Sequence, residues 1–113
     1  MHPKSPKLLE DIRAAAEYVL EATREETLEA YERNRTLRFA VERNFEIIGE
    51  ALNRLRKIDE ATTDRIPDWA QVVAFRNLLI HGYDVIDHSR VWTVIVNDLP
   101  RLYLLNEAVG DEE

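Results

Sequence analysis

Apolar residues recur at intervals of three and four positions along most of the chain, which is the spacing of one face of an α-helix. No segment sustains the alternation of apolar and polar residues that is typical of a β-strand. The pattern predicts four helical stretches: one that begins near Ser5 and continues weakly through Tyr31, one over about 35–58, one from 66 to about 83, and one after Asp87. The sequence therefore predicts an all-α bundle with short connections.

Several residues mark where these helices are expected to begin, break or bend. Ser5 followed by Pro6 predicts an N-cap and the first position of the first helix. The polar residues from 59 to 65 predict a break after the second helix, and Asp87 predicts the N-cap of the fourth. Pro100 cannot donate a backbone hydrogen bond, so we expect it to kink or divide that last helix.

Length and charge restrict the activities open to the chain. Its 113 residues suffice for a single domain, 1–113, and it has neither an apolar run of membrane-spanning length nor the apolar segment of a signal peptide. Cysteine is absent, so thiolate metal sites and cysteine nucleophiles are excluded, and we expect a cytoplasmic protein. The net charge of −7 disfavours non-specific DNA binding, but seven basic and three acidic residues within 33–57 leave an RNA substrate open.

Three residues depart from the predicted apolar faces. Arg76 lies within the apolar arc of the third helix, which consists of Trp69, Val72, Val73, Leu79, Ile80 and Tyr83. Because a guanidinium stays charged, Arg76 must pair with a carboxylate, reach a cleft or face another subunit. Asp98 lies on the apolar stripe of the fourth helix, where it either pairs with Arg76 or caps a helix that restarts at Pro100. Phe39 lies on the polar face of the second helix, and with Arg76 it predicts a second buried surface, in a dimer.

The segment Arg76-Asn77-Leu78-Leu79-Ile80-His81-Gly82-Tyr83 concentrates side chains that suit phosphate chemistry. An arginine can hold a phosphate and stabilise charge that develops on its oxygens, and a histidine can take or give a proton near neutral pH. The 2′-hydroxyl of RNA would supply the nucleophile, so no metal is needed, and one His without Cys makes a poor metal site. From the residues alone, a capping or surface role for His81 and a structural ion pair for Arg76 remain open.

Arg76, His81 and Tyr83 form the pattern Arg-x4-His-x-Tyr, which resembles the motif of HEPN domains in the form shared by HepT-type toxins. The resemblance covers most of the chain. Residues 40–51 are similar to the second conserved block of that family, residues 66–69 leading into 76–77 to its third, and residues 91–92 with 98–100 to its fourth.

The resemblance implies a compact HEPN-type bundle of four to five helices that forms a homodimer, with the motif near the interface. It implies a metal-independent endoribonuclease toxin that acts on tRNA or mRNA without a cofactor. Arg76 and His81 would be catalytic, and Asn77 would support them or bind substrate. The resemblance also implies a partner, a nucleotidyltransferase antitoxin of the MntA type that neutralises the toxin by transferring AMP to Tyr83.

Some HEPN domains bind partners or nucleotides and are not nucleases. The alternative hypothesis is therefore a non-catalytic helical module that binds a nucleotidyltransferase or a nucleotide, with Arg76 in a structural role. The acidic tail at 110–113 has no assigned role in either case. Expression without a partner separates the two hypotheses, because a toxin should arrest growth and an interaction module should not.

Overall fold

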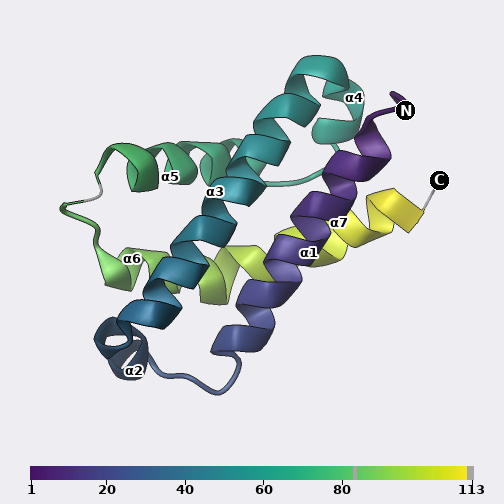
Figure 1. Cartoon of the computed structure of the whole chain (residues 1–113). Helices are drawn as coiled ribbons and strands as arrows, with labels where there is room; N and C mark the ends of the chain where they lie inside the picture. Colours follow the sequence, from purple (N-terminus) through teal and green to yellow (C-terminus); the bar gives the residue numbers. More distant parts are fainter. Residues whose placement is uncertain (83, 112–113) are drawn as a thin grey trace.

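The computed structural model describes residues 1–82 and 84–111, with the backbone alone for Leu105. Figure 1 shows the helices in order along the chain. They are α1 (Ser5–Thr23), α2 (Leu28–Arg33), α3 (Arg35–Ile58), α4 (Glu60–Thr63), α5 (Trp69–His81), α6 (His88–Thr93), the π-helical turn η1 (Val94–Asp98) and α7 (Leu99–Asp111). No strand occurs among the described residues, and the predicted all-α fold is confirmed.

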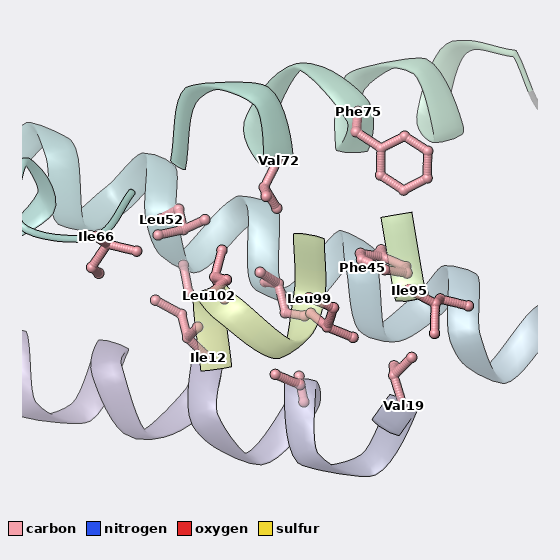
Figure 2. Packing of buried hydrophobic residues seen from close by; sticks show 14 of the residues in the cluster. Ile12, Val19, Phe45, Leu52, Ile66, Val72, Phe75, Ile95, Leu99 and Leu102 are labelled. Carbon is pink, nitrogen blue, oxygen red and sulfur yellow. The ribbon is translucent and has the colours of Figure 1, made fainter. Parts of the chain in front are cut away.

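The long helix α3 lies between α1 on one side and α5 on the other, and the C-terminal helix α7 packs against α1 (Figure 1). Their buried faces meet in one hydrophobic cluster, to which Figure 2 shows Ile12 contributed by α1, Phe45 by α3, Phe75 by α5 and Leu99 by α7. Burial of this apolar surface is the main favourable term in folding. It holds α5, which carries the Arg76–His81 segment, against α3.

The buried face of α5 differs from the predicted apolar arc. Its buried residues are Val72, Phe75 and Leu79. The Phe75 ring, which is missing from the predicted arc, meets the Phe45 ring edge-on at 5.2 Å between centroids. Ile80, which the prediction placed inside the arc, is 37% exposed. Because α5 is apolar around much of its circumference, periodicity alone does not orient it.

Capping residues set most of the helix boundaries. The side chains of Thr27 and Asn34 each accept a hydrogen bond from the backbone N–H three residues later, at 3.1 and 3.0 Å, and so begin α2 and α3. The predicted weak continuation of the first helix through Tyr31 is therefore wrong, because α1 ends at Thr23 and a new helix starts. The predicted second helix and the predicted Asp87 cap are confirmed.

Ser5 does not cap α1, contrary to the prediction. It is the first residue of the helix, and its buried Oγ donates a hydrogen bond to Oδ2 of Asp59 at 2.7 Å. Asp59 in turn caps α4, since its Oδ1 accepts from the N–H of Thr62 at 3.2 Å. The predicted polar break at 59–65 thus contains a short helix that is tied to the N-terminus.

The last helix passes Pro100 through a widened turn. Pro100 lacks the N–H that would bond the carbonyl of Val96. In the turn before it, the N–H of Leu99 bonds the carbonyl of Val94, five residues earlier, which is the π-helical pattern. The division predicted at Pro100 therefore takes the form of η1, and Asp98 is the last residue of this turn, directly before the first residue of α7.

Candidate functional site

Arg76 extends from α5 toward α3, and both terminal nitrogens of its guanidinium are bonded. Nη2 donates to Oε2 of Glu50 at 2.9 Å, and Nη1 donates to Oδ1 of Asn77 at 3.0 Å. The Arg76 side chain is 21% exposed. Its carboxylate partner comes from α3, so the alternative that paired Arg76 with Asp98 is wrong. The Nε atom of Arg76 is buried and has no hydrogen-bond partner among the described residues.

Gly49 allows α3 and α5 to approach closely at Arg76. A Cβ atom built on Gly49 would overlap the Cβ and Cγ atoms of Arg76 and would lie 3.1 Å from its Cδ. Gly49 is itself buried in the middle of α3. Glycine in a helix interior costs roughly 0.5–1 kcal/mol relative to alanine. At this position, the missing side chain makes room for the stem of Arg76.

The carboxylate of Glu50 is shared between two arginines. Its Oε1 accepts from Nε of Arg54 at 2.9 Å, one turn along α3, while its Oε2 accepts from Arg76. The three residues line a surface hollow of about 250 Å3 between α1, α3 and α5. The other charged residues that line this hollow are Asp11, Arg43 and Glu46. Arg76 therefore reaches a small, strongly charged depression rather than the apolar core.

His81 is the last residue of α5 and is exposed. Five positions separate it from Arg76, so the two side chains leave the helix about 140° apart. His81 does not line the hollow that Arg76 reaches. The structure thus brings Arg76 together with Asn77 by a hydrogen bond and leaves His81 on a different face of α5. Asn77, four positions before His81, shares the face of the histidine.

Of the two residues that follow His81 in the motif, the structure describes Gly82. Gly82 ends α5, and its N–H bonds the carbonyl of Leu78 at 2.8 Å. Tyr83, which the sequence analysis singles out for modification, lies outside the described residues. The third helix was predicted to end near 83, but α5 ends at His81. It was predicted to begin at 66, but α5 begins at Trp69, because Asp68 directly before it adopts a left-handed φ of 64°.

Exposed apolar side chains occur at the end of α5, just beyond it, and on α3. Leu78 is 54% exposed, and Val85 beyond the segment is 78% exposed. Phe39 on α3 is 54% exposed, as expected for a residue on the polar face, and the Arg35 guanidinium lies 5.1 Å from its ring centroid. Single exposed apolar residues are ordinary. Leu78 and Val85, however, line the same surface hollow, and adjoining exposed apolar side chains are typical of a surface that another chain covers.

Sequence reasoning missed the roles of Gly49 and Glu50. Both lie in the 40–51 block on which the family resemblance rests, but neither was assigned a task. The sequence did require a carboxylate as a partner for Arg76, and three glutamates on one arc of α3 were candidates: Glu42, Glu46 and Glu50. What the sequence does not contain is the rotation of α5 that turns Arg76 toward Glu50.

Among residues 1–82 and 84–111, no three His, Asp or Glu side chains converge in a way that could hold a metal ion. None of the helices in the part of the chain that the structure describes is both long and apolar enough to cross a bilayer.

Comparison with known proteins gives relatives that are all named as ribonucleases. A protein of Methanocaldococcus jannaschii named as a candidate RNase is 35% identical over 83% of this chain and 85% of the relative. A protein of Thermococcus cleftensis named as a probable ribonuclease HepT is 36% identical over 83% of this chain and 84% of the relative. A candidate RNase of Caldanaerobacter subterraneus is 30% identical over 88% of each chain. No solved structure gives a significant match.

The family model described as "Ribonuclease HepT-like" matches residues 10–109. That range includes α3, α5 and the whole Arg-x4-His-x-Tyr pattern. The match and the relatives support ribonuclease activity and an RNA substrate at the level of the family. The chain therefore belongs to the HepT-like ribonuclease family of the HEPN superfamily.

Proposed function

We propose that this protein is a metal-independent endoribonuclease toxin in which Arg76 and His81 carry the chemistry and Asn77 supports them. The observation that carries the proposal is the placement of Arg76. Its guanidinium is held by Glu50 and Asn77 but remains at the edge of a charged hollow, where one N–H on each terminal nitrogen is left over for a phosphate oxygen. A buried structural arginine would have no such access.

The reaction would use the ribose of the substrate. The 2′-hydroxyl loses its proton and attacks the adjacent phosphorus, the new P–O2′ bond forms as the P–O5′ bond breaks, and the 5′-oxygen takes up a proton as it leaves, which gives a 2′,3′-cyclic phosphate and a 5′-hydroxyl. His81 is exposed and would take the proton from the 2′-hydroxyl or supply the one that the 5′-oxygen gains. Arg76 would stabilise the charge that builds up on the non-bridging oxygens. Because the nucleophile belongs to the RNA, the scheme requires no metal.

We propose that the working form is a homodimer. Arg76 and His81 leave α5 about 140° apart, which is a poor arrangement for two groups that must act on one phosphate. A two-fold axis beside α5 would let two copies of the motif face one cleft. It would also cover the exposed apolar residues around the segment and concentrate positive charge in a protein whose net charge is −7.

The family resemblance supports a regulatory partner. We propose that an MntA-type nucleotidyltransferase acts as antitoxin in the cytoplasm by transferring AMP from ATP to Tyr83. The tyrosine follows His81 by two positions. An added phosphodiester and nucleoside at that position would compete with RNA by occupancy and by charge.

The rival function is a non-catalytic module that binds a nucleotidyltransferase or a nucleotide. The ion pair between Arg76 and Glu50 favours it, since the pair gives Arg76 a structural task. Removing one partner of a well-buried pair costs about 3–5 kcal/mol, and this pair is only partly buried. The rival therefore predicts that Arg76→Ala lowers the melting temperature and that no RNA is cleaved by either protein.

RNA cleavage by the purified protein in EDTA tests the proposal. The wild type should cut total tRNA or mRNA, and Arg76→Ala and His81→Ala should each lose about 100-fold or more in rate while circular dichroism shows an intact helical fold. Expression without the antitoxin should arrest growth for the wild type only. Absence of cleavage by the wild type, or unchanged cleavage by both variants, would rule out the nuclease.

A further inference from the structure

The Gly49-Glu50 pair in the middle of α3 is built around one side chain of another helix. Gly49 leaves the space that the Cβ and Cγ atoms of Arg76 fill, and the next residue, Glu50, accepts a hydrogen bond from the end of the same side chain at 2.9 Å. Two adjacent residues thus fix the stem and the head of Arg76. The contact spans 26 positions in sequence, so only the packing of α3 on α5 creates it.

The carboxylate of Glu50 is fixed in its turn. Arg54 donates from Nε to Oε1 at 2.9 Å, which leaves Oε2 directed at Arg76. Asn77 accepts from the opposite nitrogen of the Arg76 guanidinium at 3.0 Å. Hydrogen bonds in which both groups are charged are among the strongest that side chains make. The plane of the Arg76 guanidinium is therefore defined on two sides.

We propose that Glu50 is a positioning residue for Arg76, and that Gly49 provides the close approach which this positioning requires. The inference rests on the nuclease function proposed above, because only a catalytic arginine has a reaction that misplacement would slow. Glu50 does not touch the RNA in this proposal. It restricts the guanidinium to one orientation at the hollow, so that the two remaining N–H groups are presented together to the phosphate.

Cleavage kinetics of two variants at position 50 give the first test. Glu50→Ala should lower kcat by about 10- to 100-fold, which is the range expected when a catalytic group is misplaced by about 1 Å. KM should change by less than about threefold, because ground-state contacts to RNA remain. Glu50→Gln should recover most of the rate, since its amide oxygen still accepts the Arg76 hydrogen bond.

Glu46→Ala is the matched control. Glu46 lies one turn earlier on α3 and lines the same hollow, but its ion-pair partner is Arg43, at 3.2 Å. Removing it changes the local charge as much as Glu50→Ala does and leaves Arg76 held, so kcat should stay within about twofold of the wild type. Comparable losses in both variants would overturn the positioning role in favour of a general charge effect.

A second readout does not depend on cleavage. In nitrogen–proton NMR spectra of the arginine side chains, a guanidinium held on both sides rotates slowly and gives separate signals for Nη1 and Nη2. The signals that vanish in Arg76→Ala should be separate in the wild type and in Glu46→Ala, and should merge in Glu50→Ala. If the wild type cleaves no RNA, the nuclease proposal fails, and these spectra still decide whether Glu50 holds Arg76.

Two further results would overturn the inference itself. Glu50→Ala could cleave RNA as fast as the wild type or faster, which would mean that the carboxylate competes with the substrate phosphate for Arg76. The Arg76 signals could also stay separate in Glu50→Ala, which would mean that other contacts hold the guanidinium. If Gly49→Ala folds, its kcat should match that of Glu50→Ala, because the added methyl group displaces the stem of Arg76.

Discussion

The Oγ atom of Ser5 lies 2.7 Å from Oδ2 of Asp59 and donates a hydrogen bond to it, which joins the first turn of α1 to the corner between α3 and α4. The same carboxylate accepts from the backbone N–H of His2 at 3.0 Å and from the hydroxyl of Thr62 at 2.7 Å. One side chain thus joins the N-terminal residues to a segment more than fifty positions later in the sequence. These hydrogen bonds, with that from the His2 N–H as the largest cause, hold the pKa of Asp59 well below its usual range.

Replacing Asp59 should destabilise the fold in a way that depends on pH. Asp59→Ala removes the cap of α4 and the partners of Ser5 and His2, and we expect a loss of about 1–2 kcal/mol at pH 7. A carboxyl whose pKa is lowered by folding stabilises the native state above its unfolded pKa, and this contribution is lost as the pH falls. Thermal melts should therefore separate wild type from variant at pH 7, and the gap between them should begin to narrow only as the pH falls below about 4, where the carboxyl of the unfolded chain starts to bind a proton.

Asp64→Ala serves as the control for that experiment. Asp64 is exposed and follows α4 directly, and its backbone rather than its side chain ends the helix. It should melt within about 0.5 kcal/mol of the wild type at every pH. A constant gap between Asp59→Ala and the wild type from pH 7 to pH 3 would contradict the charge-based explanation.

His88 should produce a second pH effect in a higher range. Burial, and then the nearby charge of Arg38, lower the pKa of His88, whose Nδ1 is buried and finds no hydrogen-bond partner in the part of the chain that the structure describes. A histidine with a lowered folded pKa resists protonation, so the unfolded chain binds more protons and stability falls as the pH drops through about 6.5. The melting temperature should fall between pH 8 and pH 5.5, and His88→Gln should show a smaller fall.

The Tyr31 ring makes an edge contact with His88 at 6.4 Å between centroids, so the substitution also perturbs packing. For this reason the slope with pH, rather than the absolute melting temperature, is the quantity to compare. Equal slopes for wild type and His88→Gln would show that other groups dominate the titration in this range.

Dimer formation can be tested at the exposed apolar surface. Sedimentation of the wild type at micromolar concentration should give a species with twice the mass of the 113-residue chain. Phe39→Glu places a charge on a side chain that is 54% exposed and should shift the protein toward the monomer. Leu104→Glu, at a 64% exposed position on α7, should leave the dimer intact. A wild type that sediments as a monomer refutes the assembly proposed here.

Modification of Tyr83 is expected to silence the enzyme. Incubation with the cognate nucleotidyltransferase and ATP should add the mass of one or more AMP groups to the wild type and abolish cleavage. Tyr83→Phe should retain most nuclease activity, because no proton transfer is assigned to the phenol, and should resist silencing. Intact-protein mass spectrometry measures both proteins directly. AMP found on Tyr83→Phe would place the regulatory residue elsewhere.

The helical class and the outline of α3 could be predicted from the sequence because Val41, Phe45, Ile48, Leu52 and Leu55 repeat along one clear stripe, and all five are buried. The orientation of α5 could not, because apolar residues occur on several of its faces and the Phe75–Phe45 contact decides which face is buried. Capping chemistry was the other gap, because Thr27 starts a helix inside an apolar pattern that had been interpreted as continuous from Ser5 to Tyr31.

The candidate site followed a similar division. The residue types in the segment from Arg76 to His81 were sufficient to indicate phosphate chemistry and a family. The carboxylate that pairs with Arg76 was not predictable, because Glu42 and Glu46 lie on the same arc of α3 as Glu50 and the sequence does not distinguish the three. Only the approach of the two helices at Gly49 selects Glu50 as the partner of Arg76.

The missing side chain at Gly49 couples that position to Arg76, although one residue has no functional group and the other is charged. Any side chain gained at 49 needs the volume that the stem of Arg76 now fills, so the two positions cannot change independently. A lineage that kept the fold but abandoned the arginine would be released from the glycine, and alanine there would then strengthen α3. The residue at 49, although it has no functional group, would thus record whether a related chain still needs its arginine.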